Sequence, residues 1–412
     1  MTSPLSCRFC HQELTRTLVD LGSTPLANSY LREESHIAAE KSYPLHARVC
    51  ETCFLVQVED VVPAEDIFSD YAYFSSFSSS WVEHARRYAE KLSGELNLGP
   101  DSLVAEIASN DGYLLKHFVA KGIPVLGIEP AANVAKSAEK VGVRTEVAFF
   151  GIETATRLAK SGLQADLMAA NNVMAHVPDI NDFIGGIPIL LGKDGVFTIE
   201  FPHLLNLIEK VQFDTIYHEH YSYLSLLTVE KILEAHGLKL FDVEELPTHG
   251  GSLRVYACHE GAGKYAETPR LGALRKKEAA AGLDTVSAYQ NFTPRVEKVR
   301  NDLLSFLQAA KAEGKKVAGY GAAAKGNTLL NYCGVGPELI EFVVDRNPEK
   351  QGTLLPGSHI PVFSPEKIWA EKPDYVLILP WNLADEISSD MAAVRDWGGR
   401  FVIPIPELEI LS

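Results

Sequence analysis

The stretch Leu103-Val-Ala-Glu106-Ile-Ala-Ser-Asn110-Asp-Gly112 decides the expected fold of this chain. Its first five residues are mostly apolar, small turn residues follow them, and the pattern then becomes helical over Gly112–Ala120. A strand that ends in a tight turn and a helix N-terminus lets backbone N–H groups approach a ligand closely. The stretch therefore predicts the first strand and the ligand loop of an α/β sheet.

The residues on either side of this stretch continue the alternation of strand and helix patterns. Short apolar runs predict buried parallel strands, and apolar residues at helical spacing predict the helices between them. We expect strands at Leu103–Ile107, Val125–Ile128, Asp166–Ala170 and Gly195–Glu200, and helices at Ser80–Leu96, Gly112–Ala120 and Ala131–Val141. This order is typical of a doubly wound, Rossmann-like α/β sheet.

Two further segments flank the predicted sheet. Residues 1–70 have few helical patterns and many turn residues, which is typical of a small module that needs a staple. After the helix-favouring stretch Arg270–Ala312, strand candidates return at Lys316–Gly319, Leu339–Asp345 and Tyr375–Leu379. We therefore expect a small module at 1–70, a central α/β domain at 71–245 and a second α/β domain at 246–412.

The composition is that of a globular protein, with 46% hydrophobic and 22% charged residues. No apolar run is long enough to cross a bilayer, and the N-terminus lacks the basic and apolar regions of a secretory signal. A formal net charge of −16 argues against broad nucleic-acid binding, which needs clustered Lys and Arg. We expect a cytoplasmic monomer with no nucleic-acid or membrane partner.

Four of the six cysteines form two Cys-x-x-Cys pairs, Cys7/Cys10 and Cys50/Cys53. Each pair turns tightly enough for both sulfurs to reach one ion, and four thiolates complete the tetrahedral coordination of Zn²⁺. Such a closed site is structural. Two redox pairs are the alternative, and the doubled spacing favours zinc.

The strand after the first ligand loop ends in an acidic residue, Glu129, which lies 17 residues beyond Gly112. A carboxylate at that point can accept hydrogen bonds from both ribose hydroxyls. The first loop has few glycines for a pyrophosphate, so S-adenosylmethionine is favoured over NAD. The loop residues expected to contact the cofactor are Glu106, Ala108, Asn110 and Gly112.

The next strand ends supply three more cofactor candidates. Phe149 is a candidate adenine wall, Asn172 can reach the cofactor, and His176 can line the pocket. An ordinary core role for Phe149 and a helix-capping role for His176 fit the pattern equally well.

The stretch Tyr217-His-Glu219-His220-Tyr-Ser-Tyr223 is dense in polar, aromatic and titratable residues. A core rarely accepts that density because each buried polar group needs a partner, so a functional cleft is expected. His218 and His220 share a face in an extended chain and could bind a metal, but no third ligand is evident. Acid–base chemistry by His220 or Glu219, with Tyr217 as a hydrogen-bond donor, is the stronger interpretation.

Motifs along nearly the whole chain resemble those of the sugar C-methyltransferases that act on 4-keto deoxysugars linked to a nucleoside diphosphate. They are the four cysteines, Tyr71-Ala-Tyr73-Phe-Ser-Ser, Glu106–Gly112, Tyr217-x-Glu219-His220, His249-Gly250-Gly251 and Gly319-Tyr320-Gly-Ala-Ala-Ala-Lys325. The resemblance implies a zinc module, a methyltransferase domain and a C-terminal α/β domain, with the sugar nucleotide held between the last two.

The resemblance also implies a mechanism, in which a base removes the proton beside the ketone and the resulting enolate takes the methyl group, with C3 as the expected position. His220 is then the expected base, Glu219 orients it or shares the role, and Tyr217 and Tyr71 line the sugar. A ketone acidifies the neighbouring C–H, and donors near its oxygen stabilise the developing oxyanion. His218 can perturb the pKa of His220 or help to select the sugar epimer.

The C-terminal loop Gly319–Lys325 follows a strand and opens a helix, a geometry that can receive a diphosphate or can simply allow close packing. The residues expected to bind the sugar nucleotide are Tyr320, Lys325, Asp345, Trp381, Asn382 and His249.

Three alternatives remain at this point. Asp345 lies about 24 residues past Gly321, so an NAD-dependent oxidoreductase that uses this loop is conceivable. A zinc-bearing scaffold leaves the density of residues 217–223 unexplained. An O- or N-methyltransferase of a nucleotide sugar would need no base for a C–H proton.

Overall fold

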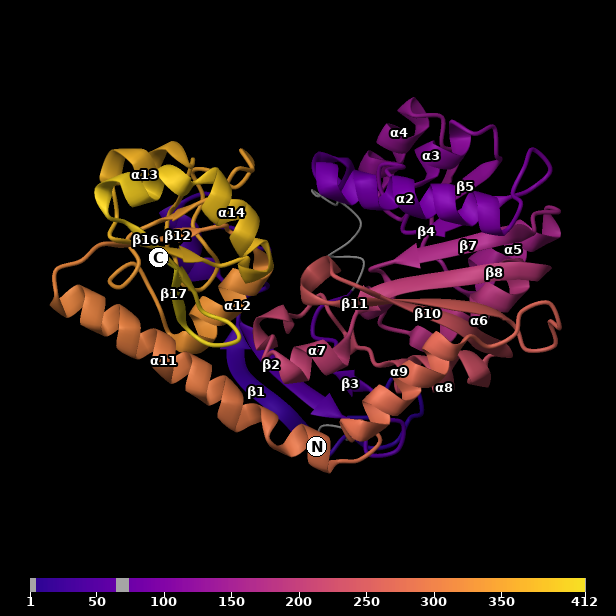
Figure 1. The fold of residues 1–412 in the computed structure, drawn as a ribbon, viewed down its shortest axis with the longest axis horizontal. Helices are drawn as coiled ribbons and strands as arrows, with labels where there is room; N and C mark the ends of the chain where they lie inside the picture. The colour runs from indigo at the N-terminus through magenta and orange to yellow at the C-terminus, as the bar shows by residue number, and fades with distance from the viewer. Residues whose placement is uncertain (1–4, 64–73, 412) are drawn as a thin grey trace.

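The computed structural model describes residues 5–63 and 74–411. Figure 1 shows two α/β bodies side by side, with the N-terminal segment running beneath and between them. The described residues form sheets of four, seven and six strands. The α/β class and the small cysteine-bearing N-terminal module expected from the sequence are both confirmed.

The central body is a seven-stranded sheet in the order β10-β11-β8-β7-β4-β5-β6. The strands from β4 to β8 are parallel, and β11 pairs antiparallel with β8. Its elements are η2 (Ser75–Phe77), α2 (Ser79–Glu95), β4 (Val104–Ile107), α3 (Leu115–Val119), β5 (Val125–Ile128), α4 (Ala132–Lys140), β6 (Thr145–Glu146), α5 (Ile152–Lys160), β7 (Ala165–Asn171), η3 (Met174–His176), α6 (Ile180–Leu190), β8 (Leu191–Pro202), α7 (Leu204–Glu209), η4 (Phe213–Thr215), α8 (Leu226–Ala235), β10 (Leu238–Leu246), η5 (Thr248–Gly250), β11 (Ser252–His259) and α9 (Pro269–Ala280).

Both faces of this sheet are covered, as the continuous apolar strands require. Tyr88 of α2 and Phe118 of α3 belong to the core on one face, and Leu158 of α5 and Ile184 of α6 belong to the core on the other. Strands β5 and β6 follow β4 on one side, and β7 and β8 are added on its other side, so the order of the strands reverses between β4 and β7. Ligands bind at such switch points in doubly wound sheets.

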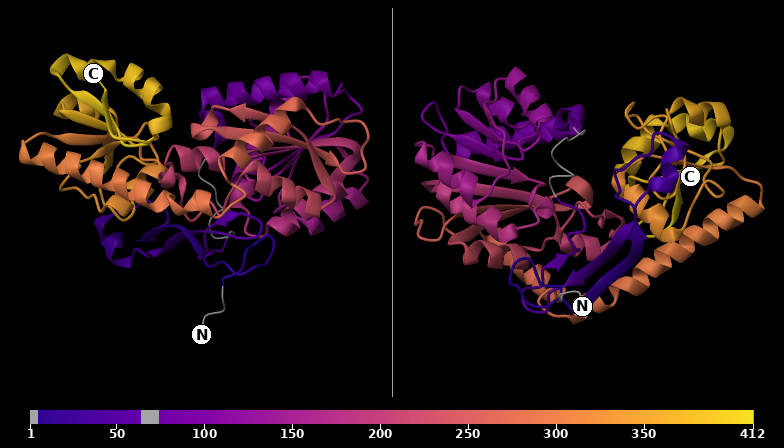
Figure 2. Two further views of the ribbon diagram at one scale, coloured as in Figure 1. Left: turned by 60° about the horizontal axis from the view of Figure 1, so that its bottom comes forward. Right: turned by 180° about the vertical axis from the view of Figure 1, so that it is seen from behind.

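The N-terminal module is a four-stranded antiparallel sheet in the order β1-β2-β3-β9. Its last strand comes from the central part of the chain, because β9 pairs with β3 through Val56 and Tyr223. Its elements are β1 (Arg16–Thr24), η1 (Glu34–Ala39), β2 (Tyr43–Val49), β3 (Val56–Gln57) and β9 (Ser222–Tyr223). Figure 2 shows this module beneath both larger bodies.

The C-terminal body is a six-stranded sheet in the order β14-β13-β12-β15-β16-β17, parallel except for β17. Its own switch point lies between β12 and β15. Its elements are α10 (Ser287–Gln290), α11 (Phe292–Ala312), β12 (Val317–Tyr320), α12 (Ala324–Cys333), β13 (Val343–Val344), β14 (Val362–Phe363), α13 (Glu366–Glu371), β15 (Tyr375–Ile378), η6 (Trp381–Leu383), α14 (Ala384–Asp390), η7 (Ala392–Trp397), β16 (Arg400–Ile403) and β17 (Glu409–Leu411).

One hydrophobic core joins the N-terminal sheet to the C-terminal body. Leu18 and Leu45 of the module, Phe213 of the central body, and Leu303 and Leu329 of the C-terminal body all belong to it. The long helix α11 runs along this core (Figure 1). The relative positions of the three parts are therefore set by buried apolar surface.

Three details differ from the expected elements. The stretch Leu339–Asp345 contributes only the two-residue strand β13, because its pairing with β12 is confined to Val343 and Val344. The stretch Arg270–Ala312 forms three helices, with a turn at Gly282, whose φ is +76°. The central sheet extends through β11 to His259, beyond residue 245.

Among the described residues, the helices are too short or too polar to cross a membrane.

Candidate active site

The four N-terminal cysteines lie together, with their Sγ atoms all within 4.8 Å of one another. The Sγ atoms of Cys7 and Cys53 are 3.5 Å apart, as are those of Cys10 and Cys50. Four thiolates at about 2.3 Å from a tetrahedral Zn²⁺ lie about 3.8 Å from one another, so this donor set fits the ion. A disulfide needs about 2.05 Å.

The zinc cluster is tied directly to the central body. The Arg8 guanidinium donates to the carbonyl oxygens of Pro178 (2.8 Å) and Val58 (2.6 Å). In return, the Asn181 side-chain amide donates to the backbone oxygens of Arg8 and Phe9. The first knuckle therefore holds the chain between η3 and α6.

At the switch point of the central sheet, the loop after β4 has the geometry of a nucleoside site. Ala108 and Asn110 have left-handed backbones, with φ of +53° and +49°, a conformation that costs non-glycine residues free energy and is found at functional sites. The Glu129 carboxylate accepts from the N–H groups of Asn110 and Ala131, both at 2.9 Å. A carboxylate has about four acceptor positions, so two remain for a pair of ribose hydroxyls.

Other atoms on this edge also lack partners. Ser109 Oγ, Asp111 Oδ1 and Asn172 Oδ1 are buried, and no described residue bonds them. Phe149 keeps 44% of its surface exposed just after β6, where a planar base can stack. Glu106 is fully buried below the loop, and burial raises its pKa well above the ordinary value. These features fit an uncharged nucleoside better than a pyrophosphate.

The turn that follows η4 fixes the tautomer of His220. Its Nδ1 lies 2.9 Å from the carbonyl oxygen of Thr215, so Nδ1 carries the proton. Its Nε2 lies 2.8 Å from the Tyr217 hydroxyl and accepts from it. Burial, and then the neighbouring His176, lower the pKa of His220 well below its ordinary value. The imidazole is therefore neutral, and the lone pair of Nε2 faces the Tyr217 hydroxyl.

His176, at the end of η3, packs against the turn that carries Glu219 and His220. The His176 ring meets the His220 ring edge to face at 4.7 Å, and its Nδ1 donates to the Glu219 carbonyl oxygen at 2.8 Å. Both carboxylate oxygens of Glu219 accept from the side-chain amide of Asn28. The hydrogen bonds that orient His220 thus come from Thr215 and Tyr217.

His218 points toward the N-terminal module, where its Nε2 meets the carbonyl oxygens of Tyr43 and Pro44 at 3.3 and 3.2 Å. His218 and His220 therefore have different partners, and Glu219 also binds the N-terminal segment through Asn28. Among the described residues, the four cysteines alone form a group that could hold a metal ion.

His249 extends the site toward the C-terminal body. It has a left-handed backbone (φ +54°), its Nε2 lies 3.4 Å from Asn172 Nδ2, and its ring lies 5.5 Å from that of Trp81. The neighbouring Gly250 has φ +89°, and a Cβ there would lie 2.6 Å from the Trp381 ring. Only glycine allows the two bodies to approach so closely.

Beneath His249, Glu200 is the centre of a buried polar network. Its carboxylate accepts from Arg254 (2.8 Å) and from Thr248 (3.1 Å), and it contacts His84 Nε2 at 2.8 Å. Burial alone would raise the pKa of Glu200, but the contact with His84 and the charge of Arg254 outweigh it and lower the pKa. This network fixes the strand ends that carry His249.

From the C-terminal body, the loop after β12 brings Lys325 into the same region. Its Nζ donates to Asn382 Oδ1 (2.6 Å) and lies 4.6 Å above the Trp381 ring. Trp381 Nε1 in turn donates to Asp214 Oδ2 of the central body at 2.7 Å. Lys325 and the adjacent residues Trp381 and Asn382, which are distant from it in sequence, therefore form one cluster.

Asp345 and Tyr320 lie to one side of this cluster. The Asp345 carboxylate accepts from the N–H groups of Ala322 (2.7 Å) and Asn347 (2.8 Å), so it shapes the loop after β12. Tyr320 is buried at the end of β12. Tyr71 lies outside the described residues.

Four residues of the site were not singled out from the sequence: Asp214, Asn28, Trp81 and Glu200. Asp214 lies only six residues before His220, so its position in the sequence could have indicated that it belongs to the site. The others come from distant segments, and the sequence carries no pattern that links them to the turn.

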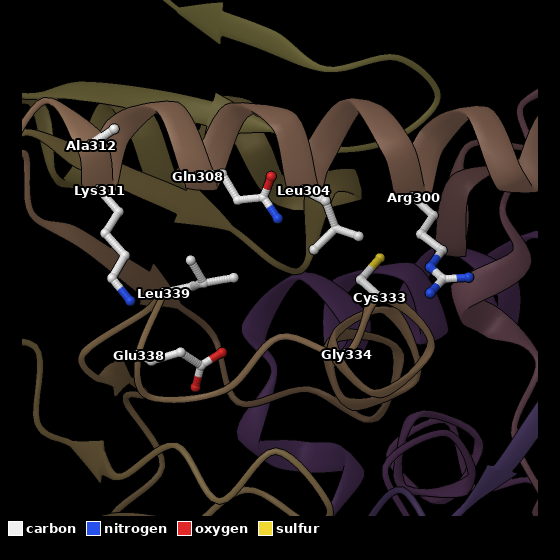
Figure 3. Close-up of a pocket in the computed structure, with 9 residues that line it drawn as sticks. All are labelled: Arg300, Leu304, Gln308, Lys311, Ala312, Cys333, Gly334, Glu338 and Leu339. Carbon is white, nitrogen blue, oxygen red and sulfur yellow. The ribbon is translucent and has the colours of Figure 1, made fainter.

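A separate cavity of about 670 Å³ lies between α11 and the end of α12 (Figure 3). Its lining includes Arg300, Lys311, Cys333 and Glu338, and it contains no residue of the cluster described above. The clustered polar and titratable residues described above therefore lie elsewhere, where the switch points of the two large sheets meet.

Comparisons with known proteins match three parts of the chain. The family model "Putative zinc binding domain" matches residues 7–68, "Methyltransferase domain" matches 81–243, and "C-methyltransferase C-terminal domain" matches 247–406. The C-methyltransferase NovU of Streptomyces niveus is 37% identical over 406 residues, which cover 98% of this chain and 96% of NovU.

Two solved structures overlap less of the chain. One is an S-adenosylmethionine-dependent methyltransferase from Clostridium acetobutylicum, with 11% identity, a TM-score of 0.35, and coverage of 44% of this chain and 92% of that one. The other is magnesium protoporphyrin IX methyltransferase from Synechocystis, with 14% identity, a TM-score of 0.36, and coverage of 49% and 100%.

The fold, the nucleoside site and the domain matches define a methyltransferase with S-adenosylmethionine as its cofactor and zinc in its N-terminal module. The chain belongs to the C-methyltransferase family that includes NovU. The oxidoreductase, scaffold and O- or N-methyltransferase alternatives do not fit this membership.

Proposed function

We propose that this C-methyltransferase acts on a 4-keto deoxysugar linked to a nucleoside diphosphate and methylates the carbon beside the ketone, at C3. The observation that carries the proposal is the neutral His220, whose Nε2 carries the lone pair that can accept a proton, because Thr215 binds the protonated Nδ1. Methylation at carbon requires loss of a C–H proton, and methylation at oxygen or nitrogen does not. A fixed base of this kind is therefore suited to carbon.

In the proposed reaction, His220 removes the proton beside the ketone, either directly or through the hydroxyl of Tyr217, which lies 2.8 Å from Nε2. The electron pair of the C–H bond moves into a C=C bond, and the ketone becomes an enolate oxygen. S-adenosylmethionine, when bound, supplies an electrophilic methyl group that is transferred from sulfur to this carbon. Removal of the proton to a neutral imidazole creates positive charge beside the developing oxyanion.

The residues on the cofactor side would hold the adenosine portion. We assign the ribose to Glu129 and the adenine face to Phe149, with Glu106, Ala108, Asn110 and Gly112 shaping the loop and Asn172 and His176 lining the pocket toward His220. The sugar nucleotide would lie on the opposite side, against His249, Lys325, Trp381 and Asn382, with Tyr320 and Asp345 next to them. Tyr71 is assigned to the sugar by its motif alone.

The test incubates the full-length protein with methyl-labelled S-adenosylmethionine and a panel of 4-keto sugar nucleotides. We expect label in the sugar, at C3 by NMR, with at least one member of the panel. Label transfer to none of them would refute the proposed substrate class.

The role of His220 is tested by exchange of the substrate C–H proton in deuterated solvent without the cofactor. His220→Asn should slow this exchange by about 10²- to 10⁴-fold, and Tyr217→Phe shows whether the phenol relays the proton. His236→Asn is the control, because His236 caps α8 through its contact with Ile232 and lies outside the site. Unchanged exchange in His220→Asn would move the base role to another residue, with Glu219 the next candidate.

A further inference from the structure

Helix α12 of the C-terminal body lies directly on the segment that leads to the His220 turn. Thr328 Oγ1 donates to the Ile216 carbonyl oxygen at 3.0 Å, and the Tyr332 ring meets the Phe213 ring at 5.4 Å. Lys325 lies three residues before Thr328 and seven before Tyr332, so the three side chains share one helix face. The first turn of α12 therefore brings Lys325 to the catalytic turn.

Asp214 ties the Lys325 cluster to this turn from the other side. The residue is fully buried, and its carboxylate accepts from Trp381 Nε1 at 2.7 Å. Burial raises the pKa of Asp214 to about 6, and the positive charge of Lys325 acts in the opposite direction. Asp214 directly precedes Thr215, whose carbonyl oxygen binds His220. Asp214, which acts on the charge of Lys325, and Thr215, which binds His220, are thus adjacent residues of one short segment.

The environment of Lys325 leaves its ammonium available to a ligand. An ammonium has three N–H donors, and among the described residues Asn382 accepts one of them, while Trp381 offers its ring face. Burial lowers the pKa of Lys325, and Asp214 opposes that shift. The charge of Lys325 is also one of the influences that lower the pKa of His220, after burial and His176. The charge of Lys325 therefore acts on the His220 imidazole across the site.

We propose that Lys325 is a catalytic residue that donates a hydrogen bond to the keto oxygen of the substrate while His220 removes the neighbouring proton. The proposal rests on the proposed function and deepens it. When the C–H bond breaks, its electron pair forms the C=C bond, and the carbonyl π pair moves to oxygen. The ammonium keeps its proton and stabilises the resulting oxyanion. Asp214 and Trp381 are positioning residues that hold the ammonium in place.

A role for Lys325 as an anchor for the diphosphate fits the surroundings less well. The buried Asp214 carboxylate lies in the same cluster, and its negative charge opposes the approach of a diphosphate dianion. A keto oxygen is neutral in the ground state and gains charge only during the reaction. A lysine whose charge is partly balanced by a carboxylate is therefore better matched to an oxyanion that develops transiently.

The experiment separates these two roles by comparing Lys325→Met and wild type in two assays. The first is substrate proton exchange with deuterated solvent, and the second is calorimetric binding of the nucleoside diphosphate alone. We expect exchange to fall by about 10²- to 10³-fold, with unchanged diphosphate affinity. Lys367→Met is the matched control and should change neither assay, because Lys367 also lies 4.6 Å above an aromatic ring, that of Phe363.

Weakened binding of the nucleoside diphosphate with normal exchange at saturating substrate would overturn the proposal in favour of a phosphate anchor. Equal exchange and binding in the variant and wild type would also overturn it. If Lys325→Met does not fold, Asn382→Ala removes the acceptor that positions the ammonium, and slower exchange at unchanged affinity is expected again. Absence of exchange and methyl transfer in wild type with every sugar would instead reject the proposed function itself.

Discussion

At the scale of single residues, His220 depends on two short contacts made by its own turn. Thr215 binds Nδ1 and Tyr217 binds Nε2, so the imidazole is held in one tautomer before any substrate arrives. In the proposed role of His220 as the base, preorganisation of this kind would remove the cost of orienting the imidazole. Burial, the neighbouring His176 and the charge of Lys325 together disfavour the protonated form of His220.

This arrangement predicts the pH dependence of proton exchange. An unperturbed histidine loses its basic form as the pH falls through about 6.5. The pKa of His220 is lowered, so the imidazole stays unprotonated as the pH falls below that value, and that of His176, lowered to about 4, behaves similarly. We expect exchange rates measured from pH 8 to pH 5 to show no acid limb centred at 6.5.

Asp214 is the control for this profile, because burial raises its pKa to about 6. A limb near pH 6 that disappears in Asp214→Asn belongs to that carboxyl group. A limb at 6.5 that persists in Asp214→Asn would contradict the lowered pKa of His220 and this prediction with it.

At the scale of elements, the zinc module supplies a strand partner to β9, which follows the His220 turn. Strand β3 follows the second cysteine pair and binds β9, which begins two residues after His220. The first pair reaches η3 through Arg8 and Pro178. Bound zinc would therefore organise the two segments that carry His220 and His176, and four thiolates would leave the ion no open position for chemistry.

Removal of zinc should therefore separate catalysis from cofactor binding. We expect Cys53→Ser to lose the metal and most methyl transfer, because the β3–β9 pairing is weakened. Its affinity for S-adenosylmethionine should change little, since Glu129 and the loop after β4 lie elsewhere on the sheet. Metal content, turnover and calorimetric binding of the cofactor check these expectations.

Cys258→Ala is the matched control, because Cys258 is also buried but lies on β11, outside the metal cluster. It should retain zinc and turnover. Full activity in metal-free Cys53→Ser would contradict a structural link between the zinc module and the turn.

The elements themselves were largely predictable from sequence, and the contacts between them were not. Apolar runs predicted β4, β5, β7 and β15 to within two residues, because buried parallel strands carry a continuous signal. The cysteine spacing predicted the metal cluster because each Cys-x-x-Cys pair is also a pattern within a short stretch of sequence. The links from Asn28 to Glu219 and from Trp381 to Asp214 join separate bodies. No periodicity in the sequence indicates such a contact, so only the fold shows the partners of the His220 turn.

At the scale of the whole molecule, a short N-terminal segment links all three parts at the site. Asn28 donates to Glu219 of the central body, and the backbone oxygen of its neighbour Ala27 accepts from Asn327 of α12 at 2.7 Å. Burial raises the pKa of Glu219, and the amide of Asn28 opposes that rise. Glu219 thus has a clear structural role, whether or not it also takes part in the chemistry.

An exchange of side chains between these two positions separates the two roles. Asn28→Asp places a second carboxyl group against Glu219, and we expect the free energy of unfolding to fall by about 2–3 kcal/mol near neutral pH. The loss should shrink as the pH falls, because protonation of either carboxyl restores a donor. Thermal or denaturant unfolding at several pH values measures both effects.

The double variant Asn28→Asp/Glu219→Gln completes this exchange, since the new amide at 219 can donate to the new carboxylate at 28. Stability should then recover toward that of the wild type. Recovery of methyl transfer as well would show that Glu219 acts only by joining the N-terminal module to the turn. Restored stability without restored transfer would show that the carboxylate is needed beside His220 itself. If stability does not recover in the double variant, the Asn28–Glu219 contact is not what holds these parts together.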